Sequence, residues 1–314
     1  MKFISFLFYL CVKITVNKLR GDFMKIVPEN CNIPSVCVRP SSLGNKFKKI
    51  GYGSEGIVYR YNDSTAIKMF DANMLPHKLD KVLELYNLRD KNFCFPKGIV
   101  YTRNNKLVGI EMNLIKKSSE YKSFLNLFLE HIPYGKIPLS DLITILFKID
   151  GAIQRVHSYG YTIGDLRPAN ILLNESNEPI FVDTDSGSYK NYDYDMKYPR
   201  IFWLRNVYKK KKKKIDNDIY VWAIMFLESL LTYNSLNKKF DDYMSIELYQ
   251  SEKMFKELIN RLNLEKDRKE GLRMIFSDKD NKPYIGDILS DCHLNKPLLS
   301  RSSSKILSLK CMMK

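Results

Sequence analysis

Apolar positions follow one period in the first part of the chain and another in the second. From residue 46 to residue 115 they come in short runs separated by glycine or asparagine turns, which is typical of β-strands. Between these runs, residues 77–89 place leucine, valine and tyrosine on one helical face. This part therefore predicts a small antiparallel sheet and one helix, with strands at 46–62 (two strands around a glycine turn), 64–70, 98–101 and 107–112.

After residue 116 the apolar residues recur at helical spacing. The clearest stripe runs from Leu142 to Val156 and predicts a helix that is capped by Ser140 and ends near Gly160. Residues 218–231 are apolar nearly all round, which indicates a buried helix. The second part is therefore predicted to be mainly helical, with further helices at 124–130, 251–264 and 266–276.

The two ends of the chain lack such patterns. Residues 1–24 form an apolar leader that Lys13 interrupts and that is too short to span a bilayer. Met24 offers a second start, so the leader is either an upstream extension or weak anchor, or an export signal. An irregular lead-in is expected at 25–43 and a tail at 297–314.

Composition changes this picture in two respects. The chain of 314 residues carries a net charge of +16, which favours acidic partners or a solvated basic surface. Its six cysteines show no CxxC spacing, so a zinc cluster is not expected, and they are interpreted as reduced thiols of a cytoplasmic protein.

Three polar residues carry the candidate chemistry. Asp165 stands five positions before Asn170, and Asp183 follows a short apolar run thirteen residues later. Phosphoryl transfer from ATP requires a carboxylate that orients the attacking hydroxyl and oxygen ligands for Mg²⁺. The order Asp, four residues, Asn and then Asp resembles the catalytic loop and metal-binding strand of the protein-kinase-like superfamily.

The resemblance implies a role for each polar residue of this region. Asp165 would be the catalytic base, and Arg167 would lie near the transferring phosphoryl group. Asn170 and Asp183 would bind Mg²⁺. Asp218 resembles the aspartate that begins the central helix of a kinase and holds the catalytic loop by hydrogen bonds, whereas His157 is interpreted as structural.

A second set of residues resembles the nucleotide site of the same superfamily. Lys68 would hold the α- and β-phosphates, and Glu84 on the predicted helix 77–89 would form the ion pair that orients it. Met112 would line the back of the adenine pocket or belong to the core. The remaining expected nucleotide contacts are Gly51, Gly53, Gly56, Val58 and Ala66.

Several positions depart from the superfamily pattern. Ile163-Gly164 replaces the usual His-Arg, which predicts that phosphorylation of an activation segment does not switch the protein. Asp183-Thr184-Asp185 replaces Asp-Phe-Gly, and Asp185 is expected to face solvent rather than a metal. The Ala-Pro-Glu motif of the peptide platform is missing.

Together these residues predict an α+β, two-lobed protein-kinase-like fold with lobes at 44–116 and 117–296 that bind ATP and Mg²⁺ between them. The expected activity is that of a Ser/Thr protein kinase of divergent, bacterial type. The alternatives are an aminoglycoside- or choline-type phosphotransferase, whose Gly-Asp-x-x-x-x-Asn loop Gly164–Asn170 also resembles, and a scaffold without turnover. A protein substrate is expected. Nucleic acid is not, because the run Lys209–Lys214 lacks interleaved aromatics, and membrane contact would involve only the leader.

Overall fold

The computed structural model describes residues 33–38, 46–53, 55–71, 78–193, 214–234, 259–277, 281–292 and 294. The predicted leader 1–24, the tail 297–314 and most of the lysine run lie outside these residues. The chain is α+β and divides into two compact units. Unit 1 comprises the residues up to Lys116 together with Val182–Asp185, and unit 2 comprises Lys117–Phe181 and the residues from Ser186 onward.

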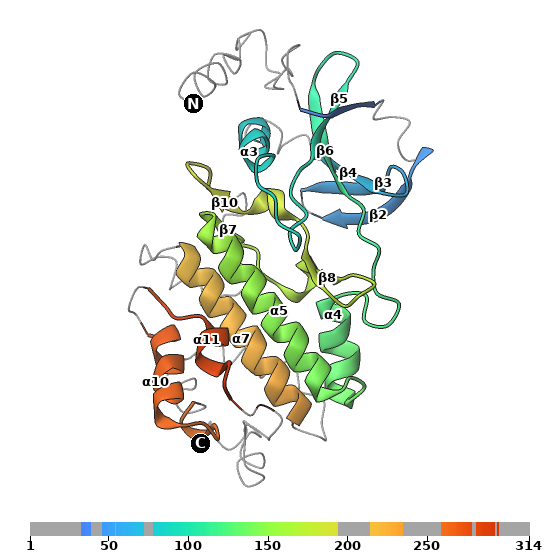
Figure 1. The fold of residues 1–314 in the computed structure, drawn as a ribbon. Helices are drawn as coiled ribbons and strands as arrows, with labels where there is room; N and C mark the ends of the chain where they lie inside the picture. Colours follow the sequence, from blue (N-terminus) through green and yellow to red (C-terminus); the bar gives the residue numbers. More distant parts are fainter. Residues whose placement is uncertain are drawn as a thin grey trace, which may run out of the picture. The chain divides into compact units, whose positions relative to one another are not determined.

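Unit 1 is built on a mixed six-stranded sheet with the order β1-β5-β6-β4-β3-β2 (Figure 1). The strands expected from the alternating runs are present as β2 to β6, and they pair with one another in antiparallel fashion. The bounds are β1 Ser35–Val38, β2 Lys48–Gly53, β3 Gly56–Arg60, β4 Thr65–Phe70, β5 Gly98–Thr102 and β6 Leu107–Asn113.

Strand β1 corrects two predictions, the irregular lead-in and the purely antiparallel sheet. It pairs in parallel with β5, with Val36 opposite Val100. Four residues are too few to show an alternating pattern, so this strand is determined by a distant partner rather than by its own sequence. Its residue Val38 joins a small core with Ile67, Val100 and Val108.

The hairpin between β2 and β3 is held closely against β4 at Gly56. This residue has φ +152°, and a Cβ atom there would lie 1.9 Å from the carbonyl oxygen of Met69. Only glycine fits this close approach of two backbones. The preceding residue, Glu55, is fixed there as well, because its carbonyl oxygen accepts a hydrogen bond from the Asp71 amide at 2.9 Å.

Helix α3 spans Lys78–Leu85 and is shorter than the predicted helix 77–89. After Leu85 the chain continues in turns, with hydrogen bonds from Asn87 to Glu84 and from Leu88 to Leu85. The apolar pattern extends past the helix because Leu88 is also buried and Tyr86 half-buried, and periodicity alone does not distinguish such residues from helical ones.

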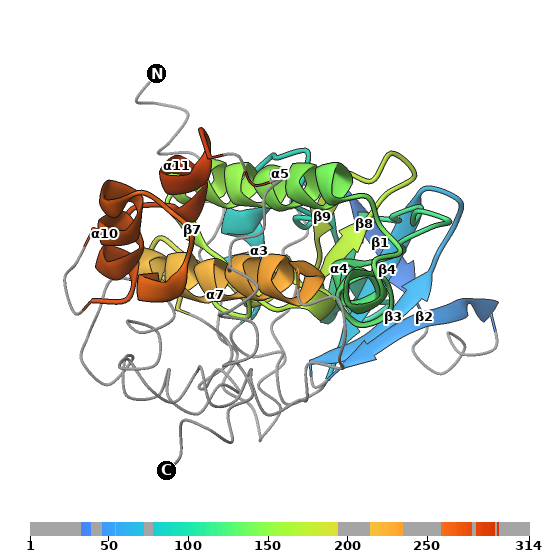
Figure 2. The same ribbon diagram turned by 90° about the horizontal axis from the view of Figure 1, so that it is seen from below.

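Unit 2 is mainly helical, as expected. Helices α5 and α7 run side by side, with α10 and α11 at one end of the pair (Figures 1 and 2). None of the helices among the described residues combines the length and apolarity needed to cross a membrane. The helices are α4 Phe124–Asn126, α5 Leu139–Ser158, α7 Lys214–Asn234, α10 Lys266–Ile275 and α11 Ile285–Leu289. Two short ladders pair β7 Tyr161–Thr162 with β10 Ser188–Tyr189, and β8 Ile171–Leu173 with β9 Pro179–Phe181.

Two helix starts differ from the prediction. Helix α5 begins at Leu139 after Pro138, so Ser140 lies in its first turn and is not the cap. Its hydroxyl contacts the Asp141 carboxylate at 3.2 Å. Helix α7 begins at Lys214, which places Asp218 in the second turn, so its side chain does not cap the helix.

A buried carboxylate joins three helices of unit 2. Asp150 of α5 is 2 % exposed and accepts hydrogen bonds from the Trp222 indole of α7 at 2.9 Å and from the Gln154 amide at 2.7 Å. The backbone of Gly286 in α11 adds a third. Burial raises the pKa of Asp150 to about 6, and these hydrogen bonds only partly oppose the rise.

We expect Asp150→Asn to remove a pH-dependent part of the stability. The carboxyl pKa is higher in the folded protein than in the unfolded chain, so protonation favours folding. The contribution is complete below about pH 4 and is lost as the pH rises through about 6, with a magnitude on the order of 2–3 kcal/mol. Urea unfolding followed by circular dichroism between these pH values should show this slope in the wild type and a flatter one in the variant. Parallel profiles would contradict it.

Candidate functional site

Lys68 is the centre of a buried charged cluster in unit 1. It lies on β4, is 4 % exposed, and has Val58 of β3 and Ile110 of β6 as its cross-strand neighbours. Its ammonium contacts Glu55 Oε2 at 3.0 Å, both carboxylate oxygens of Asp185 at 2.9 and 3.0 Å, and Asp183 Oδ1. Each of the three N–H donors of the lysine therefore has a carboxylate partner.

The charges of this cluster depend on one another. Burial lowers the pKa of Lys68, but the fields of Asp185, Asp183 and Glu55 outweigh it and raise that pKa above its usual range, so the ammonium stays charged. Burial raises the pKa of Asp183, and Lys68 opposes this rise. The Lys68 ammonium thus forms ion pairs with Glu55, Asp183 and Asp185.

The segment after β9 brings both aspartates to Lys68. Asp183 adopts φ +63°, a left-handed conformation that is uncommon for residues other than glycine and is often found at functional sites. Thr184 anchors the segment by donating its hydroxyl to the Cys94 carbonyl at 2.8 Å. Asp185 is 1 % exposed, so the expectation that it faces solvent is wrong. Its contact with a buried lysine, 117 residues away in sequence, keeps it inside.

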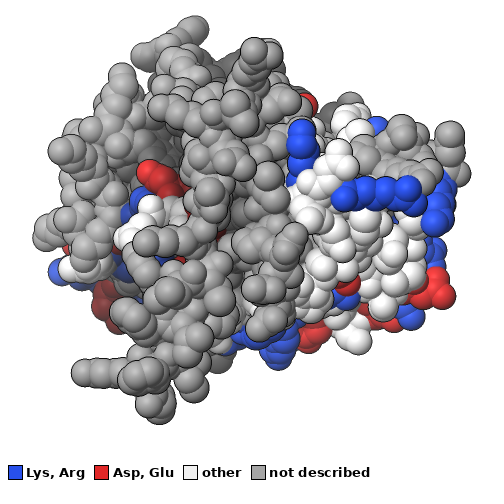
Figure 3. Space-filling view, turned by 90° about the horizontal axis from the view of Figure 1, so that it is seen from above, with Lys and Arg blue, Asp and Glu red and all other residues white. Residues whose placement is uncertain are grey.

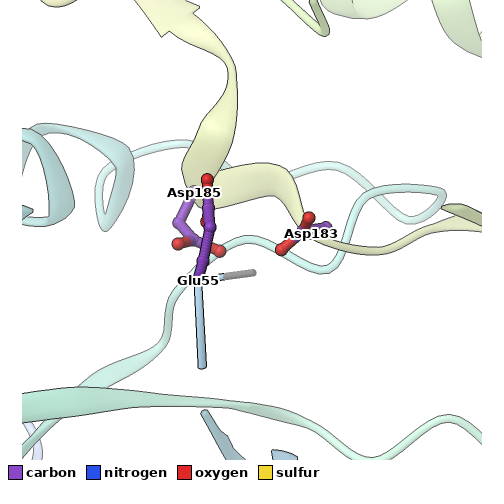
Figure 4. A group of neighbouring side chains, drawn as sticks. All are labelled: Glu55, Asp183 and Asp185. Carbon is purple, nitrogen blue, oxygen red and sulfur yellow. The ribbon is translucent and has the colours of Figure 1, made fainter. Parts of the chain in front are cut away.

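Three carboxylates of unit 1 could hold a metal ion. One oxygen each of Glu55, Asp183 and Asp185 lies within 4.8 Å of the others (Figure 4). Carboxylate oxygens are the hard ligands that Mg²⁺ and Ca²⁺ take in proteins. Of the three, Asp183 has the most accessible side chain, with 27 % of it exposed against 6 % or less for the other two.

The predicted pairing of Lys68 with Glu84 is not present. Glu84 lies on α3, whereas the ammonium of Lys68 makes its ion pairs with Glu55, Asp183 and Asp185 among the described residues. A glutamate of the glycine turn thus stands in contact with the lysine where a glutamate of the helix was expected. Helical periodicity identified the buried face of α3 but not the direction in which its charged residues point.

The other predicted nucleotide contacts lie on β2, β3, β4 and β6. Ala66 is directly opposite Met112 in the sheet, and both are buried. Gly51 is paired with Val58, and a Cβ atom at Gly53 would meet no atom within 4 Å. Of the three glycines, only Gly56 is required by the packing of the protein itself.

The predicted catalytic loop belongs to unit 2 and is folded around Asp165. The Asn170 amide nitrogen donates to the Asp165 backbone carbonyl and to its carboxylate Oδ2, both at 3.0 Å. Arg167 Nε lies 3.1 Å from the same Oδ2, without hydrogen-bond alignment. Because these bonds use only the amide nitrogen of Asn170, its carbonyl oxygen keeps its capacity to accept or to bind a cation.

The Asp218 carboxylate holds the backbone of this loop by hydrogen bonds, which confirms the prediction made for this residue. Its carboxylate accepts from the amide of Ile163 at 2.6 Å and from that of Gly164 at 3.0 Å. Gly164 has φ +73°, a conformation that glycine adopts without strain. A third contact comes from His157 Nε2 at 3.0 Å, so His157 is structural, as expected.

The His157 ring extends this network to the C-terminal part of unit 2. Since the Asp218 carboxylate only accepts, Nε2 carries the proton, and in the neutral imidazole Nδ1 accepts from the Tyr284 hydroxyl at 2.9 Å. Burial raises the pKa of Tyr284 to about 12, which keeps that hydroxyl a donor. Sequence reasoning missed Tyr284, because nothing local links it to residue 157.

We expect Asp218→Asn to destabilise unit 2 by about 1–3 kcal/mol, because a side-chain NH₂ would replace an oxygen that faces buried donors. The matched control is Glu175→Gln, at an exposed carboxylate of the same unit, which should change the free energy of unfolding by less than about 0.5 kcal/mol. Urea unfolding measures both. Equal stability of the two variants would show that the hydrogen bonds of Asp218 are unimportant.

No protein-family model matches this chain, and neither does any curated protein sequence.

Proposed function

We propose that this protein is an ATP-dependent phosphotransferase, most simply a protein kinase that acts on Ser or Thr hydroxyls. The observation that carries the proposal is the ion pair of Lys68 with Asp183, residues 115 positions apart in sequence. The resemblance assigns phosphate binding to the first and metal binding to the second. A lysine chosen by chance on a strand would more often extend to solvent than meet this particular aspartate.

The residues present fit Mg²⁺ and ATP. Asp183 offers a partly accessible carboxylate, Asn170 offers a carbonyl oxygen, and Lys68 offers a charged ammonium that phosphate oxygens can accept from. When bound, Mg²⁺ would neutralise charge on the phosphates. The open space over Gly53 and the small side chain of Ala66 are compatible with close approach of a nucleotide.

The proposed chemistry of unit 2 rests on Asp165. Its carboxylate would accept the proton of the attacking hydroxyl, and the Asn170 amide orients that carboxylate. Arg167 keeps 40 % of its side chain exposed, so its guanidinium can turn toward a phosphoryl group and stabilise developing charge there. Asp218 would fix the loop that carries these residues, which makes it a positioning residue.

The surface charge favours an acidic acceptor. The chain carries a net charge of +16. On the face drawn in Figure 3, Lys and Arg side chains occupy much of the margin of the described surface, with some Asp and Glu between them. A field of this sign raises the rate at which acidic protein segments are encountered.

A small-molecule phosphotransferase is the second candidate. The left-handed conformation of Gly164, directly before Asp165, gives a physical reason for the Gly-Asp pair that such enzymes share with this chain. A screen with γ-labelled ATP separates the two candidates, using Ser/Thr peptides with acidic flanks on one side and aminoglycosides and choline on the other. Label on the peptides supports the protein kinase, whereas label on a small molecule supports the small-molecule phosphotransferase. Label on neither, together with bound Mg·ATP, would indicate a scaffold.

A further inference from the structure

The short helix α11 is fixed to the core of unit 2 by buried contacts. It packs against α5 and α7 (Figure 2), and the amide of Gly286 donates to the Asp150 carboxylate of α5. A Cβ atom at residue 286 would lie 2.2 Å from Asp150 Oδ2, so any side chain there would displace the carboxylate. Arg268 of α10 donates to the Ile288 carbonyl at 2.7 Å. These contacts hold Tyr284, the residue directly before α11, in its place.

The Tyr284 hydroxyl is connected to the predicted catalytic loop through one imidazole ring. It lies 2.9 Å from Nδ1 of His157, and Nε2 of the same ring lies 3.0 Å from Asp218 Oδ2. That oxygen also accepts from the Ile163 amide, and Oδ1 accepts from the Gly164 amide. The next residue along the chain carries the carboxylate proposed to receive the proton.

The Tyr284 hydroxyl orients the His157 ring. This ring is 4 % exposed, and its two nitrogens bond to Tyr284 and Asp218 among the described residues. Burial and the nearby charges of Asp150 and Asp218 raise the pKa of Tyr284, so its hydroxyl remains a donor. Without that hydroxyl, Nδ1 would be a buried acceptor without a donor, which favours rotation of the ring away from Asp218.

We propose that Tyr284 is a positioning residue for the loop that carries Asp165 and that it acts through His157 and Asp218. The proposal rests on the function proposed above and adds a residue from the C-terminal part of unit 2 to the support of that site. The hydroxyl fixes the ring, the ring donates to the Asp218 carboxylate, and the carboxylate holds the two loop amides that precede Asp165.

The competing role for Tyr284 is packing alone. Its ring centroid lies 5.8 Å from that of His157, and burial of the ring stabilises unit 2 whether or not the hydroxyl is present. Tyr284→Phe keeps the ring and removes only the hydroxyl, so the two roles can be separated. Packing alone predicts small changes spread over the unit, whereas positioning predicts a change concentrated at the amides of Ile163 and Gly164.

The first measurement is amide hydrogen exchange by NMR on the full chain without nucleotide. Tyr284→Phe should speed exchange at Ile163 and Gly164 by about ten-fold, and that of the core amides of α5 by less than about three-fold. The second is label transfer from γ-labelled ATP, in which kcat should fall by about five-fold while KM for ATP stays within about two-fold. The matched control is Tyr159→Phe, at a tyrosine that is 41 % exposed, and it should change neither quantity.

Equal acceleration at the loop and at the core of α5, or none at either, overturns the proposal. An unchanged kcat despite faster exchange at both loop amides also overturns it, because transfer would then not depend on this support. If the wild type labels no acceptor and binds no Mg·ATP, while the two amides exchange faster in Tyr284→Phe, Tyr284 supports the loop and only the proposed function fails.

Discussion

Asp165→Ala should slow phosphoryl transfer by about 10²–10⁴-fold while leaving the dissociation constant of Mg·ATP within about two-fold of the wild type. Asp165 would act on the acceptor hydroxyl rather than on the nucleotide, so its loss affects the chemical step and not binding. The Asp165 carboxylate also accepts a hydrogen bond from the Asn170 amide, so the variant leaves one hydrogen of that amide without this acceptor. The Asp165 side chain is partly exposed, so a water molecule can replace the carboxylate at little cost.

The measurement is the rate of label transfer from γ-labelled ATP to the best acceptor of the screen, with affinity measured in parallel. Asp267→Ala is the control, since Asp267 is an exposed aspartate of α10 in the same unit. A variant at Asp165 that keeps the full rate would show that another group receives the proton.

Lys68→Met should both abolish binding of Mg·ATP and destabilise unit 1 by about 3–5 kcal/mol at neutral pH. Without the ammonium, Glu55, Asp183 and Asp185 remain close together and lose the positive charge that each of them pairs with. Their repulsion raises the pKa of the carboxyl groups in the folded variant. Protonation of these carboxyl groups then reduces their repulsion, so the loss of stability should become smaller as the pH falls toward about 5.

Urea unfolding at about pH 7 and pH 5 tests this expectation, with Lys91→Met as the control because Lys91 is an exposed lysine of the same unit. A variant at Lys68 that is as stable as this control at both pH values would mean that the charged cluster does not hold the fold. The comparison also shows whether lost nucleotide binding reflects the lost ammonium or an unfolded unit.

Many of the strands and helices could be predicted because they follow from local patterns of apolar and polar residues. Alternating runs gave the strands β2 to β6, and the helical stripe gave α5 to within two residues at its start. Asp218 was identified by its place at the start of an apolar helix, and its two hydrogen bonds to the loop backbone are present. Lys68 and Asp183, singled out for one shared ligand, lie in contact, and their roles remain predictions.

The errors concern features that local patterns do not encode. Strand β1 forms by pairing in parallel with β5. Its four residues are too few to predict this pairing from the local sequence. The exchange of Glu84 for Glu55 at Lys68 depends on the close packing of Gly56 against Met69. Asp185 is buried because an ammonium meets it inside the protein, whereas its polar type alone suggested solvent. Each case is a long-range contact that reverses a local preference.

The most direct test of the central claim is a crystal structure of the protein with Mg²⁺ and a non-hydrolysable ATP analogue. The account predicts a phosphate oxygen within hydrogen-bond distance of Lys68 Nζ and a cation on the Asp183 carboxylate. A nucleotide bound elsewhere, with Lys68 still held by its three carboxylates, would contradict it.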